Sequence, residues 1–120
     1  MKEVNEMAFE KEMLKGYIDI IILSMLYKED LYGYELAKRV KEQTNEQFEL
    51  KEGTLYLAFK RLEKNELIES YWGSENVGGR RKYYKLLPTG REQINQRKKE
   101  WQLIKEMMDM FLEGVNRDEQ

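Results

Sequence analysis

The sequence predicts a mainly helical α+β fold, because four helical patterns accompany two short strand-like runs. The runs are residues 67–72 and the stretch that begins with Tyr83 and Tyr84, and both are rich in the aromatic and apolar side chains that suit strands. Between them stand Gly78 and Gly79, which permit a tight bend, and then three consecutive cations. A helical pattern over residues 52–65 precedes the first run. Helix, strand, basic hairpin and strand is the order of a winged helix, whose hairpin wing carries positive charge to a nucleic-acid backbone.

Apolar side chains in residues 11–28 recur at the i, i+3, i+4 and i+7 spacing of a helix. One apolar stripe consists of Leu14, Tyr17, Ile18, Ile21 and Met25, and a second face consists of Met13, Ile20 and Leu23. A helix with two apolar faces packs between its own core and a further surface. That surface is either a dimer partner or another part of the same core.

A second helix is expected to open at residues 31–36 and to end near Thr44 and Asn45. Phe48 and Leu50 then alternate with polar or charged residues, which predicts a very short strand.

The helix over residues 52–65 carries one apolar seam and one outward face. The seam consists of Leu55, Phe59 and Leu62, and the outward face consists of Gly53, Leu57, Lys60 and Lys64, flanked by Arg61. Glycine costs about 1 kcal/mol relative to alanine inside a helix. Gly53 either lets the backbone approach a ligand closely or is simply tolerated near a helix start.

These outward residues, together with the wing, are the candidate DNA contacts. Thr54 and Leu57 suit base edges, because their methyl groups match the methyl group of thymine. Arg61 either binds phosphate or pairs with Glu63 or another acid, and the phenol of Tyr56 either reaches a phosphate or lies at the edge of the core. The wing candidates are Gly79, Arg80, Arg81 and Lys82. Their cations either bind phosphates without reading sequence or form a solvated charged run.

The last helical pattern runs from Pro88 to about Gly114, and proline favours a first helical turn. Ile94, Trp101, Met108 and Val115 are spaced by seven, with Ile104 and Phe111 at the complementary position. Heptad-like spacing indicates packing against another helix. A domain of this size would not bury so long an apolar face alone, so we expect contact with a second copy of the chain.

The composition bounds the function. The 120 residues fit one domain, with a net charge of −2. Residues 73–85 nevertheless hold four cations against one acid, a local net charge of +3. Cysteine and histidine are absent, which removes thiolate nucleophiles, Ser-His triads and nearly all transition-metal sites. We therefore expect neither an enzyme nor a metal or cofactor.

The sequence also predicts the compartment. The longest apolar run, around residues 20–23, is far shorter than the roughly 20 residues of a membrane-spanning helix. The first residues lack the pattern of a signal peptide. We therefore expect a cytoplasmic protein without membrane contact.

Several motifs resemble the PadR-like winged-helix transcription regulators over residues 13–112. The matching motifs are Tyr32-Gly33-Tyr34-Glu35-Leu36, Gly53-Thr54-Leu55-Tyr56, Arg61-Leu62-Glu63, Leu67-Ile68, and Gly79-Arg80-Arg81-Lys82-Tyr83-Tyr84 with Gly90 behind it. Within the family, residues 59–64, residues 70–73 and Trp101 resemble the short-tailed branch that includes the lactococcal multidrug-resistance regulator.

The resemblance implies a homodimer held by the last helix and the first, a recognition helix in the major groove, and a wing near the backbone. The implied dimer contacts are Leu14, Ile18, Ile94, Trp101, Ile104, Met108 and Phe111. In drug-binding members of that branch, two copies of the terminal-helix tryptophan line a pocket in which flat aromatic ligands stack. Trp101 stands at the matching position, and the implied effector contacts are Trp101, Lys98, Met13, Tyr17 and Lys105.

Three positions depart from the family pattern. Asn65 and Glu66 follow the third helix where the family often has glycine, so Asn65 is expected to take the left-handed conformation. Leu87 replaces a threonine before the last helix, which then lacks a side-chain N-cap. Lys98 replaces an aromatic residue of the drug-binding members, and we expect its charged, flexible side chain to fill or polarise the pocket.

The sequence thus predicts a sequence-specific DNA-binding regulator, a dimeric repressor on a pseudo-palindromic operator, released by a small aromatic inducer. The alternative is a winged helix that binds a protein partner. The expected organisation is a flexible lead-in over residues 1–10, a DNA-binding domain over residues 11–87, and a dimerisation helix with a tail over residues 88–120.

Overall fold

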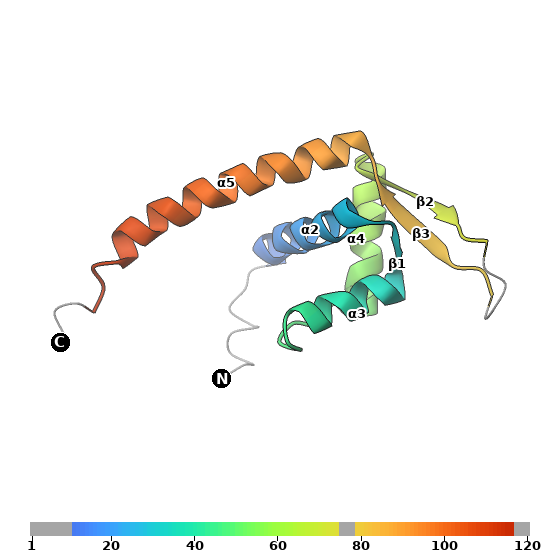
Figure 1. Cartoon of the computed structure of the whole chain (residues 1–120), viewed down its shortest axis with the longest axis horizontal. Coiled ribbons are helices and arrows are strands. Elements are labelled where there is room, and N and C mark those ends of the chain that lie inside the picture. Colours follow the sequence, from blue (N-terminus) through green and yellow to red (C-terminus); the bar gives the residue numbers. More distant parts are fainter. Residues whose placement is uncertain (1–10, 75–78, 117–120) are drawn as a thin grey trace.

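The computed structural model describes residues 11–74 and 79–116, with side chains described from Leu14 onward in these ranges. In chain order the elements are α2 (Lys11–Lys28), β1 (Leu31–Tyr32), α3 (Gly33–Gln43), α4 (Glu52–Lys64), β2 (Ile68–Trp72), β3 (Lys82–Leu86) and α5 (Pro88–Leu112) (Figure 1). The mainly helical α+β class is confirmed. The expected lead-in over residues 1–10 and the last four residues of the tail lie outside the described residues.

The three strands form one antiparallel sheet in the order β1-β3-β2. β2 and β3 are the expected hairpin, in which Ile68 lies opposite Leu86 and Trp72 lies opposite Lys82. Because side chains alternate along a strand, Ile68, Leu86 and Tyr84 share one face, and all three are buried. That face of the sheet packs against the helices.

The prediction that the second helix opens at residue 31 is wrong, because the helix begins two residues later. Leu31 and Tyr32 form β1 and pair with Tyr84 and Tyr83, and α3 begins only at Gly33. A strand of two residues is too short to show a period of its own. Its partner lies far along the chain, so only the tertiary fold reveals it.

The short strand expected around Phe48 and Leu50 is also wrong, because this segment is an irregular loop. The backbone N–H of Phe48 donates to Thr44 Oγ1 at 3.1 Å, and none of the three described strands pairs with this segment. Leu50 is 3% exposed and belongs to the core. The alternation therefore marks apolar residues that anchor a loop.

α2 is the central helix of the core. Its buried side chains are Ile18, Ile22, Leu23 and Leu26. α2 contacts α3, α4 and β3 on one side, and α5 on the other. Within one chain, the second apolar face of α2 is thus covered in part by another element of the same molecule.

α4 ends at Lys64, close to the predicted end, but the residue that reverses the chain differs from the expectation. Asn65 has φ −84°, and Glu66 takes the left-handed conformation with φ +61°. The N–H of Glu66 donates to the carbonyl of Glu63 at 2.9 Å, and Thr89 Oγ1 donates to the carbonyl of Glu66 at 2.5 Å. Contacts on both sides of Glu66 therefore fix this bend.

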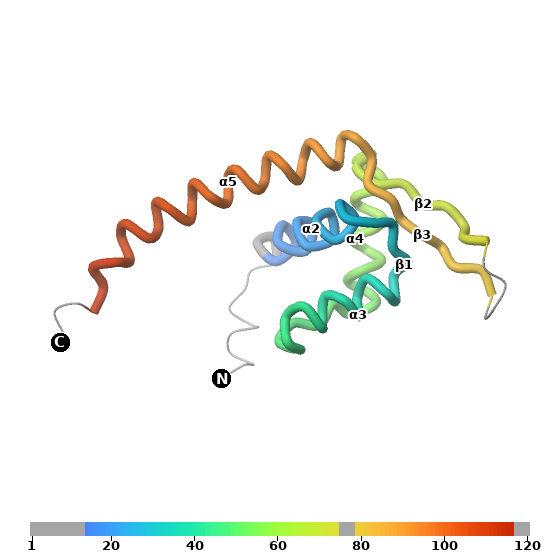
Figure 2. Tube along the Cα trace, viewed as in Figure 1, coloured from blue at the N-terminus to red at the C-terminus, as the bar shows by residue number. Residues whose placement is uncertain are grey.

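α5 begins at Pro88, and Leu87 before it makes no side-chain cap, as predicted. Gly90 and Ile94 are buried where the first turns pack on the domain. Every described residue from Lys98 onward is exposed. Figure 2 shows this part of the helix extending beyond the other elements of the molecule, which measures 63 × 32 × 22 Å.

Candidate nucleic-acid interface and adjoining cavity

α4 presents the two faces that its sequence predicts. The seam residues Leu55, Phe59 and Leu62 are buried. The candidate contacts Gly53, Thr54, Leu57, Lys60 and Lys64 are all exposed. Leu57 is 66% exposed, and a Cβ added at Gly53 would meet no atom within 4 Å. Neither residue is therefore required by packing within the chain, which leaves this face open to a ligand.

Two other candidates on α4 face inward. Arg61 makes an ion pair with Asp19 of α2, with 2.5 Å between Arg61 Nη2 and Asp19 Oδ1, and both side chains are largely covered. This matches the interpretation in which Arg61 pairs with an acid and orients the helix. The ring of Tyr56 packs edge-on against Phe59, and its hydroxyl lies against Gly33. Tyr56 is nevertheless 44% exposed, at the edge of the core.

The wing holds its cations over aromatic rings. Arg80 Cζ lies 5.1 Å from the ring centre of Trp72, and Arg81 Cζ lies 4.7 Å from that of Tyr32. Both distances are within the reach of a cation–π interaction. Gly79 has φ +91°, a conformation that only glycine adopts readily, so the bend predicted there is confirmed. Gly78, predicted to share it, lies outside the described residues.

Tyr84 joins the base of the wing to α4. Its ring stacks on Phe59 with 3.7 Å between ring centres and 14° between planes. Burial raises the pKa of the Tyr84 phenol to about 12, with a further contribution from the negative charge of Glu63. The wing is thus fixed to the helix that carries the candidate base contacts.

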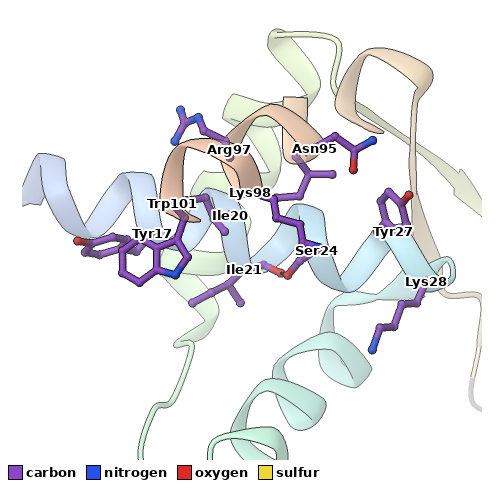
Figure 3. A pocket seen from close by; sticks show the side chains of 11 residues that line it. Tyr17, Ile20, Ile21, Ser24, Tyr27, Lys28, Asn95, Arg97, Lys98 and Trp101 are labelled. Atoms are coloured by element: carbon purple, nitrogen blue, oxygen red, sulfur yellow. Dashed lines mark hydrogen bonds between the residues drawn. The ribbon is translucent and has the colours of Figure 1, made fainter. Parts of the chain in front are cut away.

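A cavity of about 600 Å³ lies between α2 and α5. Its lining consists of Tyr17, Ile20, Ile21, Ser24, Tyr27, Lys28, Ile94, Asn95, Arg97, Lys98 and Trp101. Its size falls within the range of small-molecule sites. Figure 3 shows the indole of Trp101 beside the ring of Tyr17, and the Lys98 side chain extending from α5 toward Ser24.

Three of the five residues predicted to bind an effector line this cavity: Tyr17, Lys98 and Trp101. Lys105 lies further along α5 and pairs with Asp109, with 3.3 Å between Lys105 Nζ and Asp109 Oδ2. Met13 lies among the residues whose side chains are not described. The α2 residues Ile20, Ile21, Ser24 and Tyr27 also line the cavity. They were not among the predicted effector contacts, although they continue from Tyr17 at helical spacing.

Comparison with known proteins identifies the fold's relatives. A model of the Transcriptional regulator PadR-like family matches residues 22–96. The chain belongs to the PadR-like family of transcriptional regulators. A solved PadR family transcription regulator from Clostridium difficile is 52% identical, with a TM-score of 0.73, over 80% of this chain and 98% of that one. A solved transcriptional regulator from Clostridium thermocellum is 43% identical, with a TM-score of 0.76, over 88% and 99% of the two chains.

An uncharacterized protein from Lysinibacillus sphaericus is 42% identical over 104 residues, which are 87% of this chain and 95% of the relative. Membership of the PadR-like family implies regulation of transcription through DNA binding, and the regulators matched above are not enzymes. In the described part of the chain, no helix is both long and apolar enough to cross a membrane. Nor do the described residues contain a group of three or more acidic, histidine or cysteine side chains placed to hold a metal ion.

The predicted dimer contacts of this PadR-like chain divide into two groups. Ile18 and Ile94 are 4% and 8% exposed, and Leu14 packs against the same core, so these three stabilise the chain itself. Trp101, Ile104, Met108 and Phe111 are exposed on α5. Leu103, Met107, Met110, Leu112 and Val115 are exposed beside them. Together, these exposed residues of α5 form a larger apolar surface than the single apolar side chains that are scattered over an ordinary protein surface.

Proposed function

We propose that this PadR-like regulator is a dimeric repressor that reads a pseudo-palindromic operator and is released by a small aromatic ligand. The observation that carries the proposal is the outward face of α4, where Leu57 is 66% exposed beside exposed lysines and next to a cationic wing. An exposed apolar side chain flanked by cations suits a DNA groove better than water. The DNA-binding unit spans residues 11–87 and acts in the cytoplasm.

The contacts divide by role. Thr54 and Leu57, with the close approach that Gly53 permits, touch base edges. Lys60 and Lys64 bind phosphates beside that groove, and the wing binds phosphates further out. The hydroxyl of Tyr56 donates a hydrogen bond to a phosphate of the DNA backbone at the edge of the site. Arg61 contributes by orienting α4 through its ion pair with Asp19.

The dimer forms through residues 88–120, with α5 of one copy against α5 and α2 of the other. The support is the exposed apolar surface of α5, whose residues recur at heptad-like spacing. A two-fold axis between the copies presents two α4 helices to one face of DNA. Half-sites then lie about one helical turn apart, roughly 34 Å.

The cavity between α2 and α5 is the proposed effector site. No aspartate or glutamate is among the described residues that line it, whereas Lys28, Arg97 and Lys98 are. Lys98 extends across the cavity (Figure 3). A ligand with a flat ring between Tyr17 and Trp101 and a negative charge near Lys98 would match both the aromatic side chains and the cations of the cavity. We expect a planar aromatic anion.

Two matched probes test the ligand class: 2-naphthoate and 2-naphthylmethylammonium, which share a ring system and differ in charge. Quenching of Trp101 fluorescence is measured in a Trp72→Phe background, so that one tryptophan reports. The carboxylate is expected to bind at least about tenfold more tightly, and Lys98→Glu is expected to reverse the order. Equal binding of both probes would contradict the assignment of Lys98.

DNA binding is tested with a labelled fragment from upstream of the protein's own gene and a scrambled fragment of equal composition, across a range of salt concentrations. The expected result is tight binding of the first fragment that resists the scrambled competitor and falls steeply with salt. Equal affinity for both fragments would show that the protein binds this DNA only through non-specific phosphate contacts. Absence of binding at low salt would favour a winged helix that binds a protein partner.

A further inference from the structure

The wing has two chemically different faces. Trp72 lies opposite Lys82, and Ser70 lies opposite Tyr84, whereas Tyr71 lies opposite Tyr83. Because side chains alternate along a strand, Trp72 and Lys82 share a face with Tyr84, and Tyr71 and Tyr83 share the other face. The ladder continues beyond the last residue of β2 and the first residue of β3, since the N–H of Gly73 donates to the carbonyl of Arg81 at 2.7 Å. The alternation therefore extends to the arginines.

The two arginines lie on opposite faces. Arg80 stacks on Trp72, on the same face as Tyr84. Arg81 stacks on Tyr32, which pairs with Tyr83 on the opposite face. Adjacent cations that look equivalent in the sequence are thus held apart by different rings.

α4 lies on the face of Arg80. The ring of Phe59 on α4 stacks on Tyr84, and Ser70 Oγ donates to Glu63 Oε2 of α4 at 2.9 Å. Trp72 continues the same face beyond the region that α4 covers, and its side chain is 56% exposed. A duplex bound to the outward face of α4 therefore approaches the side of the wing that carries Trp72 and Arg80.

We propose that Trp72 is a positioning residue for DNA binding, which holds Arg80 toward the backbone of the bound duplex, while Arg81 serves the far side of the sheet and makes no comparable contact. The inference rests on the proposed DNA-binding function. Stacking uses the flat face of the guanidinium and leaves its N–H groups at the edge, where they donate to phosphate oxygens. Fixing a long side chain before binding also lowers the conformational entropy lost when the contact forms.

Single alanine variants of the two arginines test the first part, because each removes one positive charge from neighbouring positions. Affinity for an operator fragment is measured by fluorescence anisotropy at several salt concentrations. Arg80→Ala is expected to lose about tenfold in affinity, the effect of one charge-assisted hydrogen bond, and to reduce the salt slope by about 1. Arg81→Ala is expected to lose no more than about threefold, through long-range attraction alone. Equal losses for the two variants would overturn the proposal.

Substitutions of Trp72 test the second part. Trp72→Leu is expected to weaken operator binding about threefold, the effect of one exposed cation–π contact, and Trp72→Phe is expected to recover most of that loss. In an Arg80→Ala background, Trp72→Leu is expected to change nothing further. An undiminished effect in that background would show that Trp72 acts independently of Arg80 and would contradict the positioning role.

The wild-type protein separates the two levels of the account. If it binds no DNA under any condition, the proposed function fails, and the role of Trp72 and Arg80 fails with it. If it binds DNA and the Arg80 and Arg81 variants behave alike, only the role of Trp72 and Arg80 fails. Thermal unfolding of each variant shows whether a loss of binding comes from a loss of fold.

Discussion

Gly90 marks the closest approach between α5 and the rest of the chain. A Cβ at this position would overlap the carbonyl oxygen of Leu67 and lie 2.6 Å from Leu86 Cδ1. The Leu67 carbonyl cannot move freely, because it accepts a hydrogen bond from the N–H of Leu87 at 3.0 Å. We expect Gly90→Ala to lower the free energy of unfolding by about 3 kcal/mol, measured by urea denaturation.

Gly16 is the matched control for this change. It lies within α2, and an added Cβ there would meet no atom within 4 Å. Gly16→Ala is therefore expected to raise the free energy of unfolding by roughly 0.5–1 kcal/mol through helix propensity alone. If Gly90→Ala is as stable as wild type, α5 does not begin where the fold places it.

Tyr84 gives the protein a distinctive response to alkali. Its phenol has a pKa of about 12 in the folded chain, raised first by burial, against about 10 when unfolded. The unfolded chain thus releases this proton at lower pH than the folded one, so the stabilisation is complete below pH 10 and is lost as the pH rises toward 12. Two pH units correspond to at most about 2.7 kcal/mol.

Tyr84→Phe removes this dependence. As the pH rises from 10 to 12, we expect the free energy of unfolding of wild type to fall relative to that of Tyr84→Phe. Phenol ionisation followed by absorbance at 295 nm checks the assignment, since the late titration of Tyr84 is missing from the variant. A late titration that persists in Tyr84→Phe would assign it to another residue.

Sequence patterns predicted which side of α4 faces outward, because the alternation of apolar and polar residues within one helix depends only on its period. They did not identify the partner of Arg61, because Asp19 lies 42 residues away along the chain, on another helix. Nor did they separate Arg80 from Arg81, since the ring under each guanidinium comes from a different strand. Local periodicity predicts faces, whereas pairwise contacts need the tertiary fold.

The ion pair between Asp19 and Arg61 ties α4 to α2, and α2 also lines the cavity. The partners have side-chain exposures of 23% and 29%, so water screens them only in part. We expect Asp19→Asn to lower the free energy of unfolding by about 1–2 kcal/mol, because the Arg61 guanidinium loses its charged partner. A cycle with Arg61→Met, measured by urea denaturation, isolates the pairwise contribution.

The exposed pair between Lys105 and Asp109 on α5 is the control for this cycle. Its partners are 63% and 65% exposed. Asp109→Asn is expected to change the free energy of unfolding by less than about 0.5 kcal/mol. Similar effects at Asp19 and Asp109 would show that the tie between α2 and α4 carries little of the stability.

Helices with several turns were predictable from the sequence, and their ends fall close to the expected residues. Two of the errors concern the shortest segments, namely β1 and the loop around Phe48. A strand of two residues exists only because β3 provides a partner, and an apolar alternation makes a strand only where such a partner lies alongside. Both outcomes depend on how the elements assemble.

The exposed apolar half of α5 is the surface through which we expect two copies of the chain to associate. Ile104 is 48% exposed on this surface and makes no contribution to the core of the chain. We expect Ile104→Glu to convert a dimer to a folded monomer, because a carboxylate in an apolar helix interface is strongly unfavourable. Size-exclusion chromatography with light scattering measures the mass, and circular dichroism checks the fold.

Gln102→Glu is the control, because residue 102 is exposed on the side of α5 opposite residue 104. This variant is expected to remain dimeric. A wild-type protein that is monomeric at micromolar concentrations would contradict the proposed assembly. The sequence predicted this surface from its heptad-like spacing. The identity of what covers it depends on a second molecule, which no pattern within one chain specifies.

The central claim is that two copies of α4, each with its wing, bind one operator around a two-fold axis. Hydroxyl-radical footprinting of the protein on the operator fragment tests it most directly. The account predicts two equivalent protected segments on one face of the duplex, centred about 34 Å apart, with weaker protection outside each from the wings. A single protected segment, or uniform protection without a two-fold pattern, would contradict it.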